Sequence, residues 1–248
     1  MAKTNYYFAA DVHLGLQVGD AVERERRFVQ WLETVAADAK AIFLLGDIFD
    51  FWCEYKKVVP KGYVRTLGKL AELTDRGVDI HFFPGNHDLW TFGYLAEETG
   101  MTVHHQPLEI QLEGKTFYLA HGDATGKLTR GYRMLRSVFA SPFFQFCFSW
   151  IHPRWGIAFA RRWSHRSRLS KGIALPFQGE KEQLLMFAKA YAAPHAVDYF
   201  IFGHRHTPTV MPVAGHAQLL ILGEWISGCE YAVFDGATVR MIPAHKTT

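Results

Sequence analysis

The sequence of 248 residues is poor in cysteine and contains no long apolar run. Its three cysteines, Cys53, Cys147 and Cys229, are odd in number, far apart and in no C-x-x-C spacing. This pattern argues against a disulfide framework and against a thiolate zinc site, and it favours a reducing compartment. No stretch reaches the roughly 18 consecutive apolar residues of a membrane-spanning helix, and no apolar signal stretch precedes the first strand-like run. We therefore expect a cytoplasmic protein that does not cross a bilayer.

Acidic residues are absent from one part of the chain. Residues 124–179 hold ten Lys or Arg and no Asp or Glu, although the whole chain has a formal charge of only +3, so the remainder carries −7. A segment this basic suggests an anionic partner: a nucleic acid, a lipid surface or a phosphorylated substrate. A solvated helical face is the simpler explanation, but such a face usually mixes charges of both signs and has fewer aromatic residues.

The apolar residues, 49% of the chain, are arranged in short runs. Five runs rich in aromatic and branched residues predict buried strands at residues 6–10, 42–45, 80–83, 117–120 and 199–202. Between the first three strands, helical spacing predicts one helix with a stripe at Phe28, Leu32, Val35 and Ala36, and another with a stripe at Val64, Leu67 and Ala71 that ends before Gly77. A further helix is expected at residues 180–192, and closing strands at residues 219–222, 231–234 and 239–242.

This order of elements predicts an α/β fold with largely parallel strands and helices on the sheet faces. We expect residues 1–248 to form a single domain. Residues 131–170, broken by Pro142, Pro153 and Gly156, predict a helical insertion that forms a lid over the site.

A polar cluster follows each of the five predicted strands. Because the carboxyl ends of parallel strands meet in one crevice, these clusters should converge. Any one cluster alone would more simply be a surface pair, a turn or a helix cap, but five together predict a metal site. Carboxylate, amide and imidazole ligands suit manganese, iron(II) or zinc. The clusters are Asp11-Val12-His13, Gly46-Asp47-Ile48-Phe49-Asp50, Gly85-Asn86-His87-Asp88, His121-Gly122-Asp123 and Gly203-His204-Arg205-His206.

In this order, the motifs D-x-H, G-D-x-x-D, G-N-H-D, H-G-D and G-H-x-H resemble the calcineurin-like metallophosphoesterase superfamily. The resemblance implies a sandwich of β-sheets flanked by helices and two divalent cations, first of all Mn²⁺. It implies that one cation is held by Asp11, His13, Asp47 and His206, and the other by Asp47, Asn86, His121 and His204. Asp47 would bridge the two cations, and a hydroxide between them would attack phosphorus.

The same resemblance implies two catalytic residues beside the metals. His87 would protonate a leaving oxygen or bind a phosphate oxygen, and Asp50 would orient His87. For Asp88 and Asp123 we expect only a local turn contact.

Nearly the whole chain has a narrower resemblance, to UDP-2,3-diacylglucosamine diphosphatases of lipid A synthesis. It is carried by Leu14-Gly15 after the first motif, Phe51-Trp52 after the second, Pro208 after the last, the basic insertion, and Gly223 with Trp225. It implies cleavage of the pyrophosphate bond of a lipid-linked nucleotide sugar, giving UMP and 2,3-diacylglucosamine 1-phosphate, in a Gram-negative bacterium. One position departs from that family, which carries Arg where this chain has His87. This difference does not change the expected metal ligands. It leaves open which substrate is bound and how the leaving group is handled.

The insertion supports a lipid substrate independently of the resemblance. Tyr132, Leu135, Val138 and Phe139 form one apolar helical stripe, and Trp155, Phe159 and Trp163 form another, with arginines among them. We expect grooves for acyl chains and peripheral contact with the anionic surface of the inner membrane, although some of these rings would serve as lid core. Substrate contacts are expected from Asn86, His87, Ser164, Arg168, Lys171 and His204.

Two other functions fit the same residues. A nuclease or nucleotide phosphodiesterase would use the basic insertion to follow a nucleic-acid backbone, with steep salt dependence. A catalytically inactive scaffold is disfavoured because a ligand stands at every expected position. We expect the lipid-linked substrate and no nucleic acid.

Overall fold

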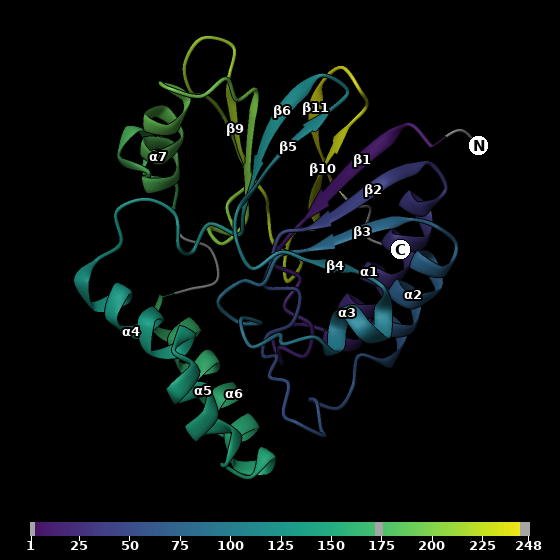
Figure 1. Ribbon diagram of the computed structural model, residues 1–248, viewed down its shortest axis with the longest axis vertical. Coiled ribbons are helices and arrows are strands. Elements are labelled where there is room, and N and C mark those ends of the chain that lie inside the picture. Colours follow the sequence, from purple (N-terminus) through teal and green to yellow (C-terminus); the bar gives the residue numbers. More distant parts are fainter. Residues whose placement is uncertain (1–2, 172–175, 244–248) are drawn as a thin grey trace.

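The computed structural model describes the backbone of residues 3–171 and 176–243, and all of these side chains except those of Arg161 and residues 165–171. Two β-sheets pack face to face, and helices cover their outer faces (Figure 1). The fold is therefore α/β, as the order of elements predicts, and the sandwich expected from the resemblance is present.

The first sheet has six strands in the order β11-β10-β1-β2-β3-β4. Strands β1 to β4 are parallel, with Tyr7 opposite Ile42 and Phe43 opposite His81, whereas β10 and β11 are antiparallel. The bounds are Asn5–Ala9 for β1, Ala39–Leu44 for β2, Asp79–Phe82 for β3, Thr102–Val103 for β4, Glu230–Phe234 for β10 and Val239–Pro243 for β11.

The second sheet has five strands in the order β5-β6-β7-β9-β8. Its centre is parallel, from β6 through β7 to β9, and both edge strands are antiparallel. The bounds are Leu108–Leu112 for β5, Lys115–Leu119 for β6, Tyr199–Phe202 for β7, Thr209–Pro212 for β8 and Gln218–Ile221 for β9. The predicted strands are all present, but β4, β5 and β8 were missed because they are short or carry exposed residues at alternate positions.

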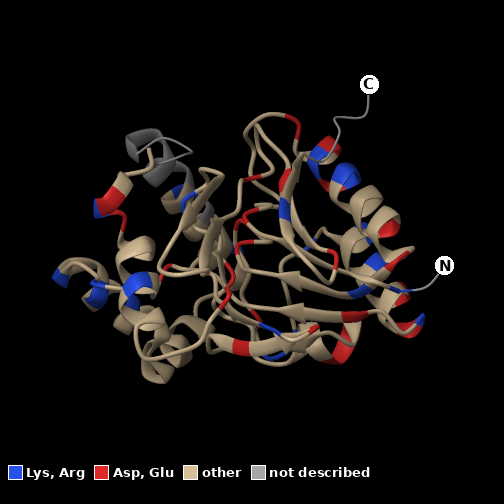
Figure 2. Ribbon diagram, turned by 90° about the horizontal axis from the view of Figure 1, so that it is seen from above, with Lys and Arg blue, Asp and Glu red and all other residues tan. Residues whose placement is uncertain are grey.

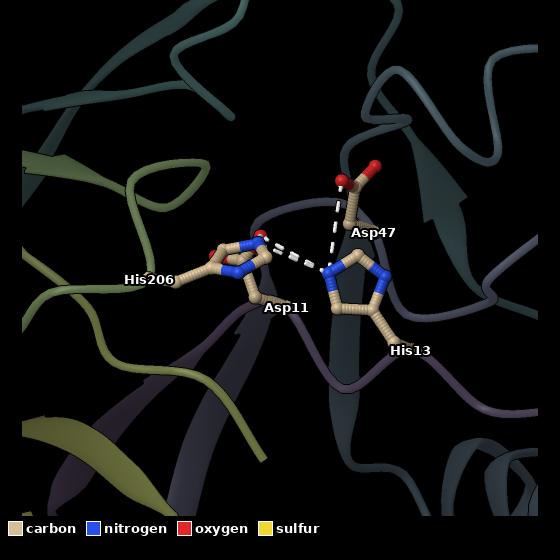
Figure 3. Close-up of side chains that lie close together, drawn as sticks. All are labelled: Asp11, His13, Asp47 and His206. Atoms are coloured by element: carbon tan, nitrogen blue, oxygen red, sulfur yellow. Dashed lines mark hydrogen bonds and ion pairs between the residues drawn. The ribbon is translucent and has the colours of Figure 1, made fainter. Parts of the chain in front are cut away.

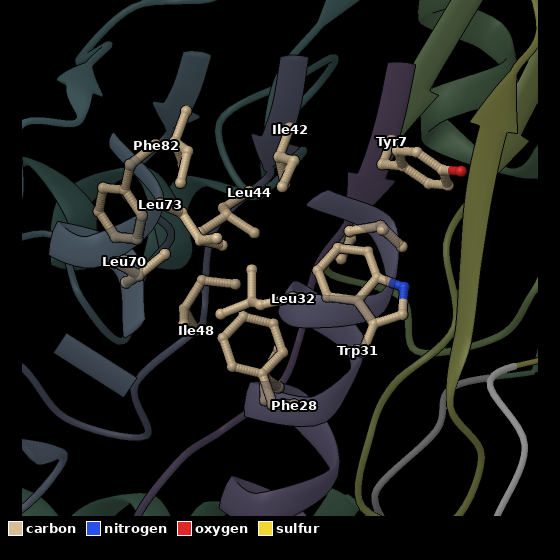
Figure 4. Packing of buried hydrophobic residues seen from close by; sticks show 14 of the residues in the cluster. Tyr7, Phe28, Trp31, Leu32, Ile42, Leu44, Ile48, Leu70, Leu73 and Phe82 are labelled. Carbon is tan, nitrogen blue, oxygen red and sulfur yellow. The ribbon is translucent and has the colours of Figure 1, made fainter. Parts of the chain in front are cut away.

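Three buried clusters hold these layers together. The cluster between the two sheets includes Phe8, Phe43 and Phe117, with the ring of Phe8 stacked on both of the others. A second cluster joins the first sheet to the helices on its outer face (Figure 4), and a third joins the second sheet to helix α7, Gln183–Ala192. The parallel strands are apolar on both faces because both faces are covered.

Helices α1 (Ala21–Ala36), α2 (Val64–Asp75) and α3 (Tyr94–Thr99) lie on the first sheet (Figure 1). Helix α1 begins at Asp20, whose side chain accepts hydrogen bonds from the backbone of Val22 and Glu23, and it buries its predicted stripe. The predicted face of α2 is partly wrong. Val64 is 79% exposed, whereas Leu67 packs against the core next to the fully buried Leu70. The apolar face of α2 thus lies further along the helix.

The insertion forms helices α4 (Arg130–Ala140), α5 (Pro142–Ser149) and α6 (Pro153–Lys171), which project from one side of the sandwich (Figure 1). Pro142 and Pro153 each begin a helix, as expected, but Gly156 does not interrupt one. It lies inside α6, where an added Cβ would stand 2.4 Å from the Tyr55 hydroxyl oxygen and 2.9 Å from Phe148 Cζ. The absence of a side chain at Gly156 allows close packing. The sequence alone does not distinguish a glycine that allows close packing from a glycine that interrupts a helix.

The charges of the helices differ between the two parts of the fold. In Figure 2, helices α1 and α2 over the first sheet carry both acidic and basic residues, whereas α4 and α6 carry basic residues and no acidic ones, and α5 carries neither. Among the described residues, none of the helices is long and apolar enough to cross a membrane.

Candidate metal centre

The five polar clusters meet at the carboxyl ends of β1, β2 and β3 in the first sheet and of β6 and β7 in the second. Backbone hydrogen bonds join their loops. Asp11 N donates to Gly46 O at 3.0 Å, and His13 N donates to Asp47 O at 2.9 Å. Within the second sheet, Gly203 N donates to His121 O at 2.9 Å. Parallel strands in both sheets thus direct all five motifs to one place.

One group of donor atoms comes from Asp11, His13, Asp47 and His206, and their ligand atoms all lie within 4.8 Å of one another (Figure 3). His206 Nε2 is 3.2 Å from Asp11 Oδ1 and 3.1 Å from His13 Nε2. His13 Nε2 is 4.0 Å from Asp47 Oδ2. Two ligands that share one cation at about 2.1 Å each lie about 3 to 3.5 Å apart, which matches the two distances from His206 Nε2, whereas the distance from His13 to Asp47 is wider.

A second group comes from Asp47, His121 and His204. His121 Nδ1 donates to the carbonyl of Leu45 at 2.8 Å, which directs its other nitrogen, Nε2, toward Asp47 Oδ2 at 3.4 Å. In this tautomer the Nε2 lone pair faces a carboxylate, so a cation or a proton must lie between the two atoms. Asp47 belongs to both groups and has the position of a bridging ligand.

Asn86 lies in the loop that contacts Asp47. It is exposed, and the next residue, His87, donates its backbone N–H to Asp47 Oδ1 at 2.8 Å. The loop thereby holds the Asp47 oxygen that is not directed at His121. The structure places Asn86 beside the second donor group, and its role as a ligand remains a prediction.

His87 and Asp50 form a third group with His13. His87 Nδ1 lies 2.8 Å from the backbone carbonyl of Asp50 and 3.8 Å from its carboxylate oxygen Oδ1. The close contact that orients the ring is therefore to the main chain of Asp50. The other nitrogen, His87 Nε2, is 4.0 Å from Asp47 Oδ2 and faces the donor groups.

The donor set fits divalent cations. Asp11 Oδ1 and His121 Nε2 are buried and make no hydrogen bond among the described residues, so a positive charge would complete their coordination. Burial disfavours the charged form of Asp47, yet the charges of His121 and His87 hold the pKa of its carboxyl well below the usual range. Burial and the charge of His121 lower the pKa of His204 to about 4, so this imidazole is neutral, as a metal ligand must be. The set contains no thiolate, which separates it from structural zinc sites.

The backbone is strained where the ligands stand. Asp11, His13, Asp47, His204 and His206 all have positive φ angles, between +49° and +69°. Among the described residues only three other non-glycine positions have a positive φ: Tyr63, Glu113 and Cys229. Each such residue costs about 1 to 3 kcal/mol and persists only where its surroundings fix it, a common feature of functional sites. Tight turns at the strand ends thus aim five side chains at one point.

Three glycines make room for the ligands. An added Cβ would stand 2.5 Å from His121 Nδ1 at Gly46, 2.2 Å from Asp47 Oδ1 at Gly85 and 2.5 Å from Asp11 Oδ2 at Gly203. Only Gly46 of the three also has a positive φ. These glycines therefore allow the backbone to pack closely against the candidate ligands.

Asp88 and Asp123 do more than the expected local turn contact. Asp88 is fully buried and accepts backbone hydrogen bonds from Gly85 and, across the site, from Asp47, Ile48 and Phe49. Burial, followed by the charge of Asp47, raises its pKa to about 7. Asp123 accepts a hydrogen bond from Arg136 Nε of α4 at 2.9 Å. Both carboxylates therefore join distant segments, which sequence spacing alone does not reveal.

Arg24 was not singled out from the sequence. It lies on α1, is 1% exposed, and donates to the carbonyl of His13 at 2.8 Å and to those of Leu16 and Val18. It thus secures the loop that carries Asp11 and His13. The available signal was a charged residue on the apolar face of α1, four positions before Phe28.

Of the three substrate contacts expected from the insertion, only Ser164 has a described side chain. Ser164 is buried, and its hydroxyl donates to Asp50 Oδ1 at 3.2 Å. Helix α6 therefore reaches the third donor group. The side chains of Arg168 and Lys171 lie outside the described residues.

The fold and the converging donor groups define a metallophosphoesterase, and comparison with known proteins agrees. Residues 4–208 match the calcineurin-like phosphoesterase family. The chain belongs to this family of metal-dependent hydrolases.

Individual proteins show a more specific similarity to this chain than the family as a whole. The chain is 42% identical, over 96% of its own length and 96% of the relative, to UDP-2,3-diacylglucosamine hydrolase of Porphyromonas gingivalis. It is 28% identical to UDP-2,3-diacylglucosamine hydrolase of Aeromonas salmonicida, covering 88% of this chain and 85% of the relative. Among solved structures it is similar to Yfce, a phosphoesterase from E. coli, with 14% identity, coverage of 98% and 95% and a TM-score of 0.48.

Proposed function

We propose that this protein hydrolyses the pyrophosphate bond of UDP-2,3-diacylglucosamine, giving UMP and 2,3-diacylglucosamine 1-phosphate. The observation that carries the proposal is the 42% identity to a UDP-2,3-diacylglucosamine hydrolase over nearly the full length of both chains. The two donor groups that share Asp47 are the chemistry such a reaction needs.

The metal ligands we assign follow the two donor groups. Asp11, His13, Asp47 and His206 would hold one divalent cation, and Asp47, Asn86, His121 and His204 the other. Mn²⁺ is our first choice, since oxygen and imidazole ligands suit it, with Fe²⁺ or Zn²⁺ as alternatives. Such a pair of cations neutralises phosphate oxygens and activates water for in-line attack.

His87 acts on the leaving group in this proposal. With Nδ1 held by the carbonyl of Asp50 at 2.8 Å, the ring presents Nε2 toward the metal ligands. From that position it can donate a proton or a hydrogen bond to a phosphate oxygen. We expect Asn86 and His204 to contact the same phosphates. Asp50 fixes the ring chiefly through its main chain, and its carboxylate also accepts the hydroxyl of Ser164.

The insertion supports the lipid part of the proposal. Trp155, Phe159 and Trp163 on α6 are 68%, 60% and 54% exposed. They are therefore not lid core in this structure, and their rings are available to acyl chains. A cavity of about 710 Å³ opens between α5 and the body and is lined by Tyr55, Phe92, Phe146 and other residues. It offers further apolar surface next to the loops that follow Asp50 and Asp88.

The same helices support peripheral contact with the inner membrane of a Gram-negative bacterium, on its cytoplasmic side. Phe143, Phe146 and Trp150 are 66%, 60% and 78% exposed on or next to α5, and α6 adds Arg154 and Arg162. Exposed rings with cations among them suit anionic lipid surfaces, where each basic residue contributes about 1 kcal/mol. Sedimentation with vesicles of phosphatidylglycerol and phosphatidylethanolamine tests this contact. Equal sedimentation with vesicles of neutral lipid alone would contradict it.

The substrate is tested with purified, manganese-loaded protein. UDP-2,3-diacylglucosamine, a panel of nucleotides and a set of oligonucleotides are incubated separately, and the products are identified by mass spectrometry. We expect UMP and 2,3-diacylglucosamine 1-phosphate from the first and little turnover of the others. Cleavage of oligonucleotides or nucleotides alone would make the protein a nuclease or nucleotide phosphodiesterase on the same metal centre.

A further inference from the structure

The lid is attached to the loops that carry the metal ligands. On α4, Arg136 Nε donates to Asp123 Oδ2 at 2.9 Å, and Asp123 follows His121 by two residues. The carbonyl of Phe139, also on α4, accepts a hydrogen bond from Trp90 Nε1 at 2.8 Å, and Trp90 stands in the loop that begins with Gly85 and Asn86. Both of these attachments fall on loops that carry candidate metal ligands.

Of the two attachments of α4, the one between Arg136 and Asp123 joins two charged side chains. Asp123 is buried, with 7% of its side chain exposed, whereas 32% of the Arg136 side chain is exposed. Two residues before Asp123 in the chain, His121 accepts a backbone hydrogen bond from Gly203 N at 2.9 Å, and the centres of the His121 and His204 rings are 5.2 Å apart. On the lid side, burial first and the charge of Asp123 next raise the pKa of the Tyr132 phenol, one turn before Arg136. Asp123 thus lies between the lid and the histidines of the second donor group.

The loop from His121 to Asp123 contains one intervening residue, Gly122, which lies beside Leu184 and Phe202. Gly122 has φ +114°, and an added Cβ would stand 3.5 Å from Leu184 Cδ2 and from Phe202 Cβ. A displacement of Asp123 would therefore move the backbone of His121, which is held through Nδ1 by the carbonyl of Leu45. Without Arg136, the buried carboxylate of Asp123 would lose the positive charge beside it, and keeping this carboxylate ionised in the same place would cost free energy.

We propose that Arg136 is a positioning residue for the hydrolysis: by holding Asp123 it fixes His121 and His204, and so couples the seating of helix α4 to the second cation site. The proposal rests on the proposed metal-dependent hydrolysis and adds a residue outside the ligand set. Partners that orient metal ligands in this way contribute roughly 10- to 100-fold to metal affinity or activity. Because Arg136 acts through Asp123, its loss should lower kcat for every substrate.

The test compares Arg136→Met and Arg136→Lys with Arg133→Met. Arg133 lies on the same helix, is exposed, and donates to the carbonyl of Leu128 at 3.3 Å, so it controls for the loss of one positive charge from α4. Two quantities are measured for each variant: the dissociation constants for Mn²⁺ by calorimetric titration, and kcat and KM on bis(p-nitrophenyl) phosphate and on UDP-2,3-diacylglucosamine. Asp123→Asn, alone and with Arg136→Met, completes a double-mutant cycle.

For Arg136→Met we expect the weaker Mn²⁺ site to lose roughly tenfold in affinity, and kcat to fall roughly tenfold on both substrates with KM little changed. Arg136→Lys should restore most of both, and the double variant should be no worse than Asp123→Asn. Arg133→Met should match the wild type. The proposal is overturned if Arg136→Met matches Arg133→Met, or if it raises only KM for the diacylated substrate, which would make Arg136 a substrate contact.

Failure of the proposed substrate would give a different pattern. The wild type would then turn over bis(p-nitrophenyl) phosphate and bind two Mn²⁺ without cleaving UDP-2,3-diacylglucosamine. The effects of Arg136→Met would still be measured by the dissociation constants for Mn²⁺ and by kcat on bis(p-nitrophenyl) phosphate. If Arg136→Met does not fold, as judged by its circular dichroism melting curve, Arg136→Lys and Asp123→Asn carry the test. Wild-type metal affinity in Asp123→Asn would then overturn the proposal.

Discussion

At the scale of single residues, the site depends on glycines as much as on ligands. Gly85 has no room for a methyl group, because a Cβ would stand 2.2 Å from Asp47 Oδ1 and 2.7 Å from the Asp47 backbone nitrogen. Asp47 belongs to both donor groups, so its displacement disturbs both cations at once. A conservative change at a residue that binds nothing should therefore be as damaging as the loss of a ligand.

We predict that Gly85→Ala binds fewer than two cations per chain and loses nearly all activity, as measured by elemental analysis and turnover of bis(p-nitrophenyl) phosphate. Gly68→Ala is the matched control, since Gly68 lies in α2 with no atom within 4 Å of an added Cβ. That change should keep full activity and stabilise the fold by up to about 1 kcal/mol. Full metal content and activity in Gly85→Ala would contradict the packing argument.

His87 should be separable from the metals, because its backbone N–H, and not its ring, contacts Asp47 at hydrogen-bonding distance. His87→Ala is predicted to keep both cations and to lose about 10² to 10⁴ in kcat, the usual contribution of a positioned acid or base. His105→Ala, a change at an exposed histidine, serves as the control. A wild-type rate with full metal content would remove His87 from the mechanism, and loss of a cation would make it a ligand.

Cation binding should depend on pH through His121. Burial lowers the pKa of this imidazole, but the charge of Asp47 more than compensates and raises it well above the usual value when no cation is present. His121 is then protonated near neutral pH and must lose its proton to bind a metal, whereas His204, with a pKa of about 4, has none to lose. Affinity should therefore rise with pH, by about tenfold per unit for one released proton.

Calorimetric titration of metal-free protein with Mn²⁺ from pH 6.5 to 8.5, in buffers of different ionisation enthalpy, counts the protons released. One proton is expected for the second cation. An affinity that does not change over this range would show that His121 is already neutral.

At the scale of elements, the residues at which the strands end could be predicted from the sequence, whereas the buried faces of the helices were predicted less well. The runs before Asp11, Asp47 and Asn86 are largely apolar, because their strands are covered on both sides, and that pattern is visible in one sequence. The face of α2 was misjudged because Val64 begins the helix at the surface. Gly156 was misjudged because close packing against Tyr55 and Phe148 leaves no local signal.

Helix α6 carries the clearest prediction at this scale. Changing Trp155, Phe159 and Trp163 to Ala should lower kcat/KM for UDP-2,3-diacylglucosamine by about tenfold or more, since partial burial of an aromatic ring against an acyl chain is worth 1 kcal/mol or above. Turnover of bis(p-nitrophenyl) phosphate should not change. Stability should shift by less than about 0.5 kcal/mol per residue, because all three rings are already more than half exposed.

Met186→Ala is the matched control for these changes, because Met186 is 51% exposed on α7, away from the insertion. Equal losses on both substrates would mean that the rings support the lid instead of binding lipid.

At the scale of the whole molecule, the residue pattern did not predict which strands belong to which of the two sheets. Buried strands such as β3 and β6 look alike in sequence, yet one lies in the first sheet and the other in the second. Only the resemblance to a known family gave the sandwich. The candidate site was more accessible to prediction, because motif order and strand exits predicted which side chains converge without requiring the sheet order.

The division of charge also belongs to this scale. The insertion lies within the basic part of the sequence, residues 124–179, whereas the acidic remainder includes the strands of the sandwich and most of the candidate metal ligands. In the proposed substrate the diphosphate joins uridine to the diacylated sugar, so its phosphates would lie at the metals and its acyl chains along the insertion.

The most direct measurement is hydrolysis of UDP-2,3-diacylglucosamine by the manganese-loaded protein in heavy-oxygen water, with both products examined by mass spectrometry. If water attacks the phosphorus nearer uridine, UMP gains one heavy oxygen and 2,3-diacylglucosamine 1-phosphate gains none, and this is the result we predict. A heavy oxygen in the lipid phosphate would reverse the orientation of the substrate, and the absence of both products would contradict the proposed function itself.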